Sequence, residues 1–194
     1  METKERCWGS RGKEMEAYHD KEWGVPVHDD KTLFEFLILE GAQAGLSWTT
    51  ILKRRGGYRK AFDNFDFNKV VKYDEKKIQN LLKDECIIRN RLKVRSAVLN
   101  AKIFIKIRKE FGSFDKYLWG FVNGVPIQSN FKSWKNFPAN TKISDELSVD
   151  LKARGMKFVG STIMYAFMQG VGMTNDHLMS CFRYEEIKKL SVCS

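Results

Sequence analysis

The chain has 194 residues, enough for one domain or two closely apposed lobes with a well-buried core. Lysine and arginine number 34 against 24 aspartates and glutamates, and the net charge of +10 favours a polyanionic partner, although basic surfaces are also ordinary solvated faces. No apolar run approaches the length of a membrane span, and no secretory signal follows Met1. We therefore expect a cytoplasmic protein with no membrane partner, whose cysteines do not pair with one another.

Helical periodicity dominates the first half of the chain. From Lys31 to Leu39 nearly every residue is apolar, which predicts a buried helix with an aspartate as its N-cap and an end at Glu40 and Gly41. Potential N-cap residues precede three further helices. These are a helix from Ser47 through Lys53, a short helix after Asp66, and a helix after Asp74 that carries Ile78, Leu81 and Leu82.

The second half continues this pattern with one interruption. The expected helices run from about Asn90 to Phe111, from Phe114 to Val122, from Asp145 to Arg154 with Ser144 as its cap, and from Val159 to Val171; a last helix, capped by Asn175, carries His177 and Cys181. The stretch from Asn123 to Thr141 holds two of the three prolines, which predicts an irregular loop. No alternating strand pattern exceeds four residues, so the predicted fold class is all-α.

Two pairs of soft metal ligands lie at opposite ends of the chain, Cys7 with His19 and His177 with Cys181. His177 and Cys181 are four residues apart, so on a helix they share one face, while the eleven residues between Cys7 and His19 leave a loop free to close on the same ion. This set predicts a closed, structural Zn²⁺ site that ties the two termini together. The alternative is that Cys7 and Cys181 bind no metal and are buried in the core as small apolar side chains. The other two cysteines have no histidine at a suitable spacing. We expect Cys86 in the core and Cys193 in the C-terminal tail.

Positive charge is concentrated between Lys83 and Lys109, where nine cationic residues and two acidic ones give +7. The nine are Lys83, Arg89, Arg91, Lys93, Arg95, Lys102, Lys106, Arg108 and Lys109. This stretch includes a predicted helical hairpin. Ile87 and Ile88 would pack the turn of this hairpin against the core. Such a hairpin can direct backbone N–H groups at a phosphate. A plain helical hairpin explains the pattern equally well, because glycines that let DNA approach such a turn are absent.

A second motif runs from Leu39 to Trp48. Glu40 directly follows the apolar helix, so its carboxylate should lie at the edge of the core, where it needs a hydrogen-bond partner. A ligand could supply that partner, since small residues around Glu40 leave space and Trp48 offers a flat surface for a purine. The alternative is an ordinary helix end with Glu40 in a salt bridge to a lysine.

A third motif surrounds the candidate ligand His19, which Tyr18 and Trp23 flank. A metal bound by His19 would also fix the position of Tyr18. Structural packing alone explains Trp23 equally well.

Several blocks of sequence, spread over nearly the whole chain, occur in a specific order and at specific separations. They are Arg6-Cys7-Trp8, Ala17 to Asp20, Glu22 to Pro26, Leu39 to Gly41, Gln43 to Trp48, Ile87 to Arg89, Lys157 to Gly160 and Asn175 to His177. Together they resemble the bacterial 3-methyladenine DNA glycosylase I family. Their order is far more specific than any single block.

This resemblance implies a helix-hairpin-helix glycosylase fold with two helical lobes, a base pocket between them and termini joined by zinc. The chain would form one domain over residues 1–194, with its hairpin at about 74–111. It would act as a monomer on double-stranded DNA containing alkylated adenine, flip out 3-methyladenine and hydrolyse its N-glycosidic bond, leaving an abasic site. Carried over by position, the catalytic residue would be Glu40, the base-binding residues Tyr18, Trp48 and Trp23, and the zinc ligands Cys7, His19, His177 and Cys181. The DNA contacts would be Leu46, as a wedge, with Arg89, Arg91 and Lys93 of the basic stretch.

The chain departs from the family pattern near the hairpin, where Cys86 replaces a glycine and Leu92 a small residue. The spacing from Cys7 to Tyr18 is a residue shorter than in some relatives, which displaces Trp8 from its usual place. Two other functions are compatible with the sequence. A non-catalytic helix-hairpin-helix module would keep the basic stretch without needing the pocket, and a zinc-dependent hydrolase would need an open coordination position.

Overall fold

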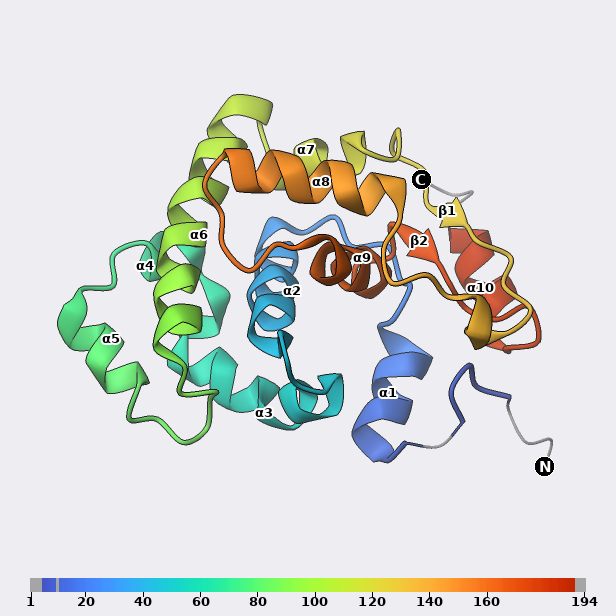
Figure 1. Cartoon of the computed structure of the whole chain (residues 1–194), viewed down its shortest axis with the longest axis horizontal. Helices are drawn as coiled ribbons and strands as arrows, with labels where there is room; N and C mark the ends of the chain where they lie inside the picture. Colours follow the sequence, from blue (N-terminus) through green and yellow to red (C-terminus); the bar gives the residue numbers. More distant parts are fainter. Residues whose placement is uncertain (1–4, 10, 191–194) are drawn as a thin grey trace.

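The computed structural model describes residues 5–9 and 11–190, so the predicted tail residue Cys193 lies outside the described part. The protein is mostly helical, as predicted, and α2 and α9 pack against each other near its centre (Figure 1). The α-helices are α1 Lys13–Lys21, α2 Asp30–Gln43, α3 Trp48–Ala61, α4 Phe67–Val70, α5 Glu75–Leu81, α6 Arg91–Phe111, α7 Phe114–Gly120, α8 Lys142–Ala153, α9 Ser161–Gly170 and α10 Arg183–Leu190. Short 3₁₀ turns η1 and η2 cover Asp63–Phe65 and Trp134–Asn136, and the two-residue strands β1 Ile127–Gln128 and β2 Thr174–Asn175 pair in parallel.

Helix α2 is buried on every side, as its apolar sequence predicts. The Asp29 side chain caps it by accepting the Thr32 N–H at 2.8 Å, and every residue from Leu33 to Ala42 is buried. The helix continues past the predicted end at Gly41 to Gln43. Helices α3, α6 and α9 pack around it, so Glu40 is carried on a helix turn enclosed by protein.

Helix α3 begins after its predicted cap, since Ser47 accepts the Thr50 N–H at 3.2 Å, but it runs well beyond the predicted end at Lys53. It passes through Gly56 and Gly57 without ending. A Cβ built on Gly57 would lie 2.6 Å from the backbone oxygen of the hairpin turn at Cys86. The glycine therefore serves close packing and does not terminate the helix.

The hairpin between α5 and the long α6 has the predicted boundaries. Asn90 caps α6 by accepting the Lys93 N–H at 3.1 Å. Ile87 is buried and the Ile88 N–H donates to the Tyr58 hydroxyl at 3.2 Å, so the turn is seated on α3. The prediction of Cys86 as a core residue is wrong, because Ile87 takes the core position and Cys86 is exposed.

Two helices near the C-terminus begin at other residues than predicted. Thr141, not Ser144, caps α8, because Ser144 is the third residue of a capping box and accepts the Thr141 N–H at 2.8 Å. Asn175 does not start a helix: its carboxamide donates across the strand pair to Gln128 at 2.8 Å. The last helix starts only at Arg183, so the prediction that the two C-terminal metal ligands lie on a helix is wrong.

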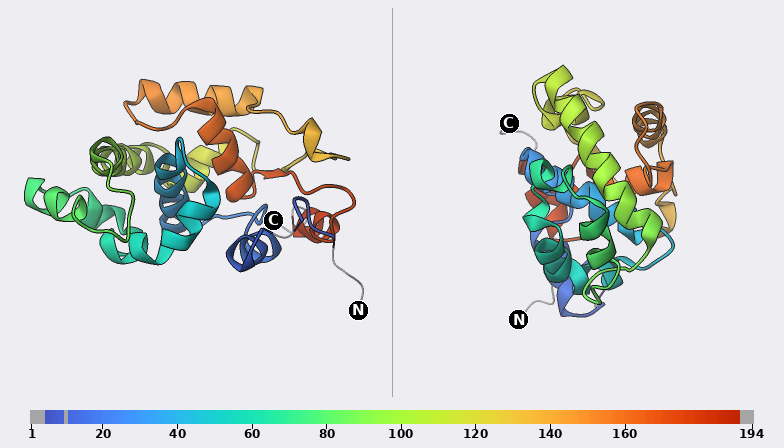
Figure 2. Two further views of the ribbon diagram at one scale, coloured as in Figure 1. Left: turned by 60° about the horizontal axis from the view of Figure 1, so that its bottom comes forward. Right: turned by 90° about the vertical axis from the view of Figure 1, so that its left-hand side faces the viewer.

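The helices α5 and α6 lie at one end of the molecule, with α1 and α10 at the other (Figure 2). One cluster of buried apolar side chains extends from Cys7 to Cys181 and connects these ends. Among the described residues, no helix combines the length and apolarity needed to cross a bilayer.

Candidate functional site

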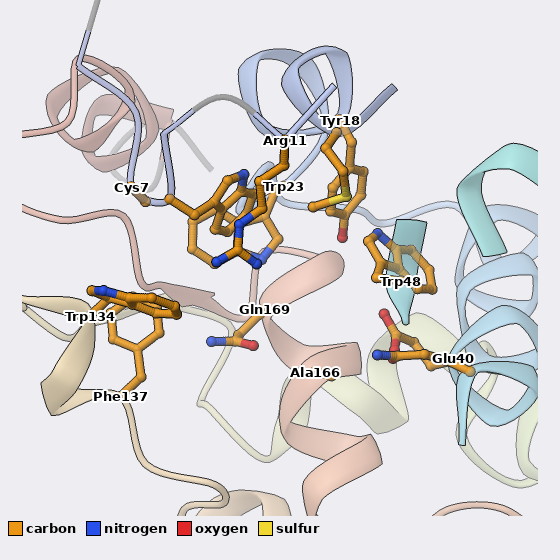
Figure 3. A pocket seen from close by; sticks show the side chains of 13 residues that line it. Cys7, Arg11, Tyr18, Trp23, Glu40, Trp48, Trp134, Phe137, Ala166 and Gln169 are labelled. Carbon is orange, nitrogen blue, oxygen red and sulfur yellow. The ribbon is translucent and has the colours of Figure 1, made fainter. Parts of the chain in front are cut away.

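A cavity of about 230 Å³ lies where α1, α2, α3 and α9 meet (Figure 3). Tyr18 comes from α1, Glu40 from the last turn of α2, Trp48 from the first residue of α3, and Trp23 from the segment after α1. These four predicted pocket residues all line this one cavity. Tyr18, Trp48 and Glu40 gather on one side of it, opposite Trp134.

Glu40 is buried, with an exposed fraction of 2%. Its Oε2 atom has no hydrogen-bond partner, and its carboxylate forms no ion pair, among the described residues. The lysine salt bridge considered from the sequence is therefore not found within the described part of the chain. Burial raises the pKa of Glu40 to about 8, because the ionised form loses its hydration without gaining a partner.

Aromatic rings enclose the space beside Glu40. The Tyr18 and Trp48 ring centroids are 5.4 Å apart, and Phe36 stacks against Trp48 at 6.4 Å with an interplanar angle of 22°. The Tyr18 hydroxyl lies 3.1 Å from the position that a Cβ on Gly170 would take. A glycine in α9 thus gives the tyrosine room, and burial raises the pKa of Tyr18 well above its ordinary value.

Trp8 also lines the cavity, although the sequence spacing placed it outside its usual position. Its ring packs on Trp23 at a centroid distance of 4.5 Å, and its buried Nε1 has no hydrogen-bond partner among the described residues. The position of Trp8 follows from its neighbour Cys7, which belongs to the metal-ligand cluster described below. That adjacency is the sequence signal that could have found it.

The rest of the cavity wall comes from residues for which the sequence predicted no place in the pocket. They are Arg11, Met15, Gln43, Trp134, Phe137, Ala166 and Gln169, together with Cys7. The Gln169 Nε2 donates to the Asp176 carboxylate at 2.7 Å. Because the Asp176 oxygen accepts this bond, the contact orients the Gln169 amide with its nitrogen toward Asp176.

The four predicted metal ligands converge in one buried cluster, with their ligand atoms within 4.8 Å of one another. The sulfur of Cys7 lies 3.4 Å from both His19 Nε2 and His177 Nδ1, and the sulfur of Cys181 lies 3.4 and 3.5 Å from the same two nitrogens. Tetrahedral zinc with ordinary Zn–S and Zn–N bonds requires sulfur–nitrogen separations of about 3.6 Å. The residues therefore fit such an ion.

Hydrogen bonds around the cluster set the histidine tautomers. His19 Nδ1 lies 2.8 Å from Asp20, which Arg6 holds through two bonds of 2.7 and 2.8 Å, and His177 Nε2 lies 2.9 Å from the Trp23 carbonyl. Each acceptor places the proton on the outer ring nitrogen and leaves the inner nitrogen's lone pair for a metal. Four protein ligands complete a tetrahedron, which is the arrangement of a structural site.

The predicted DNA contacts lie near the hairpin. Arg89 and Arg91 are exposed, and Arg89 forms an ion pair with Glu85 at 3.2 Å. Leu46 is 41% exposed on the turn between α2 and α3. Four of the nine cations counted in the basic stretch already have protein partners, so its free charge is smaller than the sequence count. These four are Arg89, Lys93, Arg95 and Arg108.

Lys93 holds the end of α2 in place. Its ammonium donates to the carbonyls of Ala42 at 2.9 Å and Ala44 at 2.6 Å, and thereby joins α6 to the turn that carries Leu46. A cation at this position also complements the negative end of the α2 dipole. Its predicted contact with DNA stays a prediction, and the structure assigns the side chain a positioning role beside it.

Known proteins share this helical fold and much of this sequence. The chain belongs to the methyladenine glycosylase family, whose sequence model matches residues 8–184. It is 45% identical over 181 residues to DNA-3-methyladenine glycosylase 1 of Escherichia coli (strain K12), covering 93% of this chain and 97% of that protein. It is 44% identical over 164 residues to DNA-3-methyladenine glycosylase of Haemophilus influenzae (strain ATCC 51907 / DSM 11121 / KW20 / Rd), covering 84% and 89%.

Solved structures agree with this assignment. A crystal structure of 3-methyladenine DNA glycosylase I matches with a TM-score of 0.89 and 44% identity, covering 92% of this chain and 98% of that one. A single-residue variant of such an enzyme, in complex with 3-methyladenine, matches with a TM-score of 0.89 and 35% identity, covering 92% and 96%. The family resemblance drawn from the sequence blocks is confirmed.

Proposed function

We propose that this protein is a DNA repair glycosylase that flips 3-methyladenine out of alkylated double-stranded DNA and hydrolyses its N-glycosidic bond, leaving an abasic site. The observation that carries the proposal is Glu40, a buried carboxylate with an unpartnered oxygen in the wall of an aromatic cavity. An unpaired buried carboxylate destabilises a fold, so its presence favours a ligand that pairs with it. The activity named for the related proteins supports the same substrate.

The chemistry of the lesion explains why so few acidic groups suffice. Methylation at N3 places a positive charge on the adenine ring, and the base becomes neutral when it departs. The enzyme therefore need not protonate the leaving group, because the damage has already removed part of the barrier. Glu40 would accept a hydrogen bond from the amino group and stabilise the cationic ring. A cation beside Glu40 lowers its pKa from about 8, so lesion binding and Glu40 ionisation favour each other.

The aromatic walls would supply the remaining recognition. Trp48 would stack on the base, with Tyr18 and Trp23 closing the pocket, and a cationic ring over an indole gains a cation–π attraction. Undamaged adenine lacks the charge and keeps a stronger glycosidic bond, so entry into the pocket would not lead to its release. We assign no residue to orient the attacking water.

On the DNA side, we propose that α5, the turn and α6 form the helix-hairpin-helix of a single two-lobed domain spanning residues 1–194. The first-turn N–H groups of α6 and the exposed Arg91 would contact a phosphate. Leu46 would fill the space that the extruded nucleotide leaves in the duplex. The protein would act as a monomer, because the pocket and the hairpin both come from one chain.

We propose Zn²⁺ as the metal of the Cys7, His19, His177 and Cys181 cluster. When bound, it would supply structural stability by tying α1 and the segment before it to the segment before α10. The closed ligand set supports this role over that of a zinc-dependent hydrolase, which needs an open position. Visible spectra of a cobalt-substituted protein test the choice: a tetrahedral spectrum insensitive to added anions is expected, and an anion-sensitive spectrum would revive the hydrolase.

The central experiment identifies the base that the protein frees from methylated DNA. Chromatography should detect 3-methyladenine, with the Glu40→Gln variant releasing far less and Glu146→Gln, at an exposed glutamate of α8, releasing as much as the unaltered protein. A non-catalytic DNA-binding module would bind DNA and release no base. Retained activity in Glu40→Gln would remove Glu40 from the reaction.

A further inference from the structure

The cavity has a second wall, opposite Glu40, that carries an exposed aromatic side chain. Trp134 borders the cavity with 53% of its surface exposed (Figure 3). It lies at the tip of residues 131–137, which we call the mouth loop. An indole ring exposed beside a cavity offers a flat face on which a nucleic-acid base can stack.

The mouth loop holds Trp134 outward by its own packing. The Phe131 and Phe137 rings at its two ends are in contact, with centroids 4.7 Å apart. The Phe131 carbonyl accepts the Met179 N–H at 2.9 Å, which fastens the loop to the segment between the metal ligands His177 and Cys181. Phe137 is half-buried and serves as cavity wall, whereas Trp134 projects beyond it.

The charged residues of the mouth loop are positive. Lys132 and Lys135 are exposed, and neither has an ion-pair partner among the described residues. The Arg11 guanidinium carbon lies 5.3 Å from the Trp134 ring centroid, and Arg11 is the one cation among the described residues that line the cavity. No acidic residue occurs in the sequence between Asp115 and Asp145. An aromatic ring among unpaired cations is the composition of a nucleic-acid strand contact.

Because the flipped nucleotide stays joined to its strand, the position of the base indicates which part of the DNA would lie near Trp134 and Arg11. In the proposed function the flipped base would occupy the part of the cavity beside buried Glu40, and its sugar and phosphates would stay at the side where exposed Arg11 and Trp134 lie. Flipping also leaves the neighbouring base without a stacking partner on one face. We propose that the mouth loop and Arg11 form a second DNA contact, in which Trp134 stacks on the base next to the flipped nucleotide while Arg11, Lys132 and Lys135 contact the phosphates of that strand.

This contact rests on the proposed function and is separate from the hairpin, which lies toward the other end of the molecule (Figure 2). Its test is the affinity of the Trp134→Ala variant for a duplex with a stable abasic-site analogue, measured by fluorescence anisotropy. Loss of one base-aromatic stack should weaken binding roughly 5- to 150-fold, since such a stack contributes about 1–3 kcal/mol. Binding of free 3-methyladenine, which has no strand, should not change.

A matched control is available at Phe111, which is 40% exposed with Arg154 5.2 Å from its ring centroid, but does not line the cavity. Phe111→Ala should bind the duplex as the unaltered protein does, and Trp134→Phe should retain most of the affinity. Replacing Lys132 and Lys135 by alanine should make the negative slope of log affinity against log salt shallower by about 0.9 for each phosphate that these lysines neutralise.

Three outcomes would overturn the proposal. Unchanged duplex affinity of Trp134→Ala would remove the stack, and an equal loss of free-base binding would make Trp134 a cavity wall only. A change in the mass of the protein in solution without a change in DNA affinity would make the loop an interface between copies. Failure of the proposed function looks different, because the unaltered protein would then release no base from methylated DNA.

Discussion

The Glu40→Gln variant should be more stable than the unaltered protein, and the gain should grow with pH. Burial raises the pKa of Glu40 from an ordinary 4.5 to about 8. When folding raises the pKa of an acid, that acid does not reduce the free energy of unfolding at a pH below its unfolded pKa. Between the unfolded and folded pKa values the reduction grows with pH, and above the folded pKa it is complete. With about 1.36 kcal/mol per pKa unit, the 3.5-unit difference corresponds to roughly 5 kcal/mol above pH 8.

The measurement is the free energy of unfolding of both proteins in urea at pH 5, 7 and 9. The advantage of the variant should increase by roughly 4 kcal/mol between pH 5 and pH 9, or on the order of 8–16 °C in Tm for a protein of this size. Burying the glutamine amide shifts the comparison equally at every pH, so the pH dependence isolates the carboxylate. Glu85→Gln is the control, because Glu85 is exposed. An advantage that does not vary with pH would show that Glu40 is not a buried, unpartnered carboxylate.

Two further predictions concern the hairpin. Gly57→Ala should destabilise the protein by about 1–3 kcal/mol and weaken duplex binding, because its Cβ would strike the hairpin turn. Gly56→Ala, which meets no described atom within 4 Å, should instead stabilise by about 0.5–1 kcal/mol in urea unfolding. Arg91→Ala should make the negative slope of log affinity against log salt shallower by about 0.9, whereas Lys93→Met should lower Tm, because Lys93 anchors the end of α2. Equal slopes for Arg91→Ala and the unaltered protein would place the phosphate contact elsewhere.

Sequence signals worked best where the deciding interaction is local. The N-cap residues Asp29, Ser47 and Asn90 each accept a hydrogen bond from the N–H three residues later. Their role can therefore be predicted from a few neighbouring residues. Ser144 was misassigned because a capping box contains two plausible caps, and the true one, Thr141, lies three residues earlier. Such an ambiguity is settled by the backbone geometry and not by residue type.

The convergence of the four candidate metal ligands was predictable because so few residue types bind zinc, yet their backbone setting was not. The helix expected around His177 and Cys181 is replaced by a loop, since the Asn175 side chain bonds across the strand pair instead of capping a helix. A tetrahedral site requires only that four atoms converge, and several backbone paths satisfy that condition.

The residues of the second cavity wall could not be predicted from the sequence, for a different reason. Trp134 and Arg11 come from distant segments, one of them in a stretch predicted only as an irregular loop. Gln169 gains its orientation from Asp176 across the cavity wall. These relations exist only after tertiary packing, whereas Glu40 was evident from a local conflict between its charge and the apolar helix around it.

The metal cluster and the buried carboxylate should be coupled through stability. A penalty of about 5 kcal/mol is comparable to the whole stability of many proteins, and a structural metal can offset it because metal-binding free energy adds to folding free energy. Cys181→Ser should therefore lower bound zinc and Tm, and adding Glu40→Gln should restore part of that Tm, more at pH 9 than at pH 5. Cys181→Ser alone should also weaken base binding, because Trp8 and Trp23 pack on His19 and His177 and lose support when the metal is lost. An unchanged metal content in Cys181→Ser, or a rescue that is the same at both pH values, would contradict this coupling.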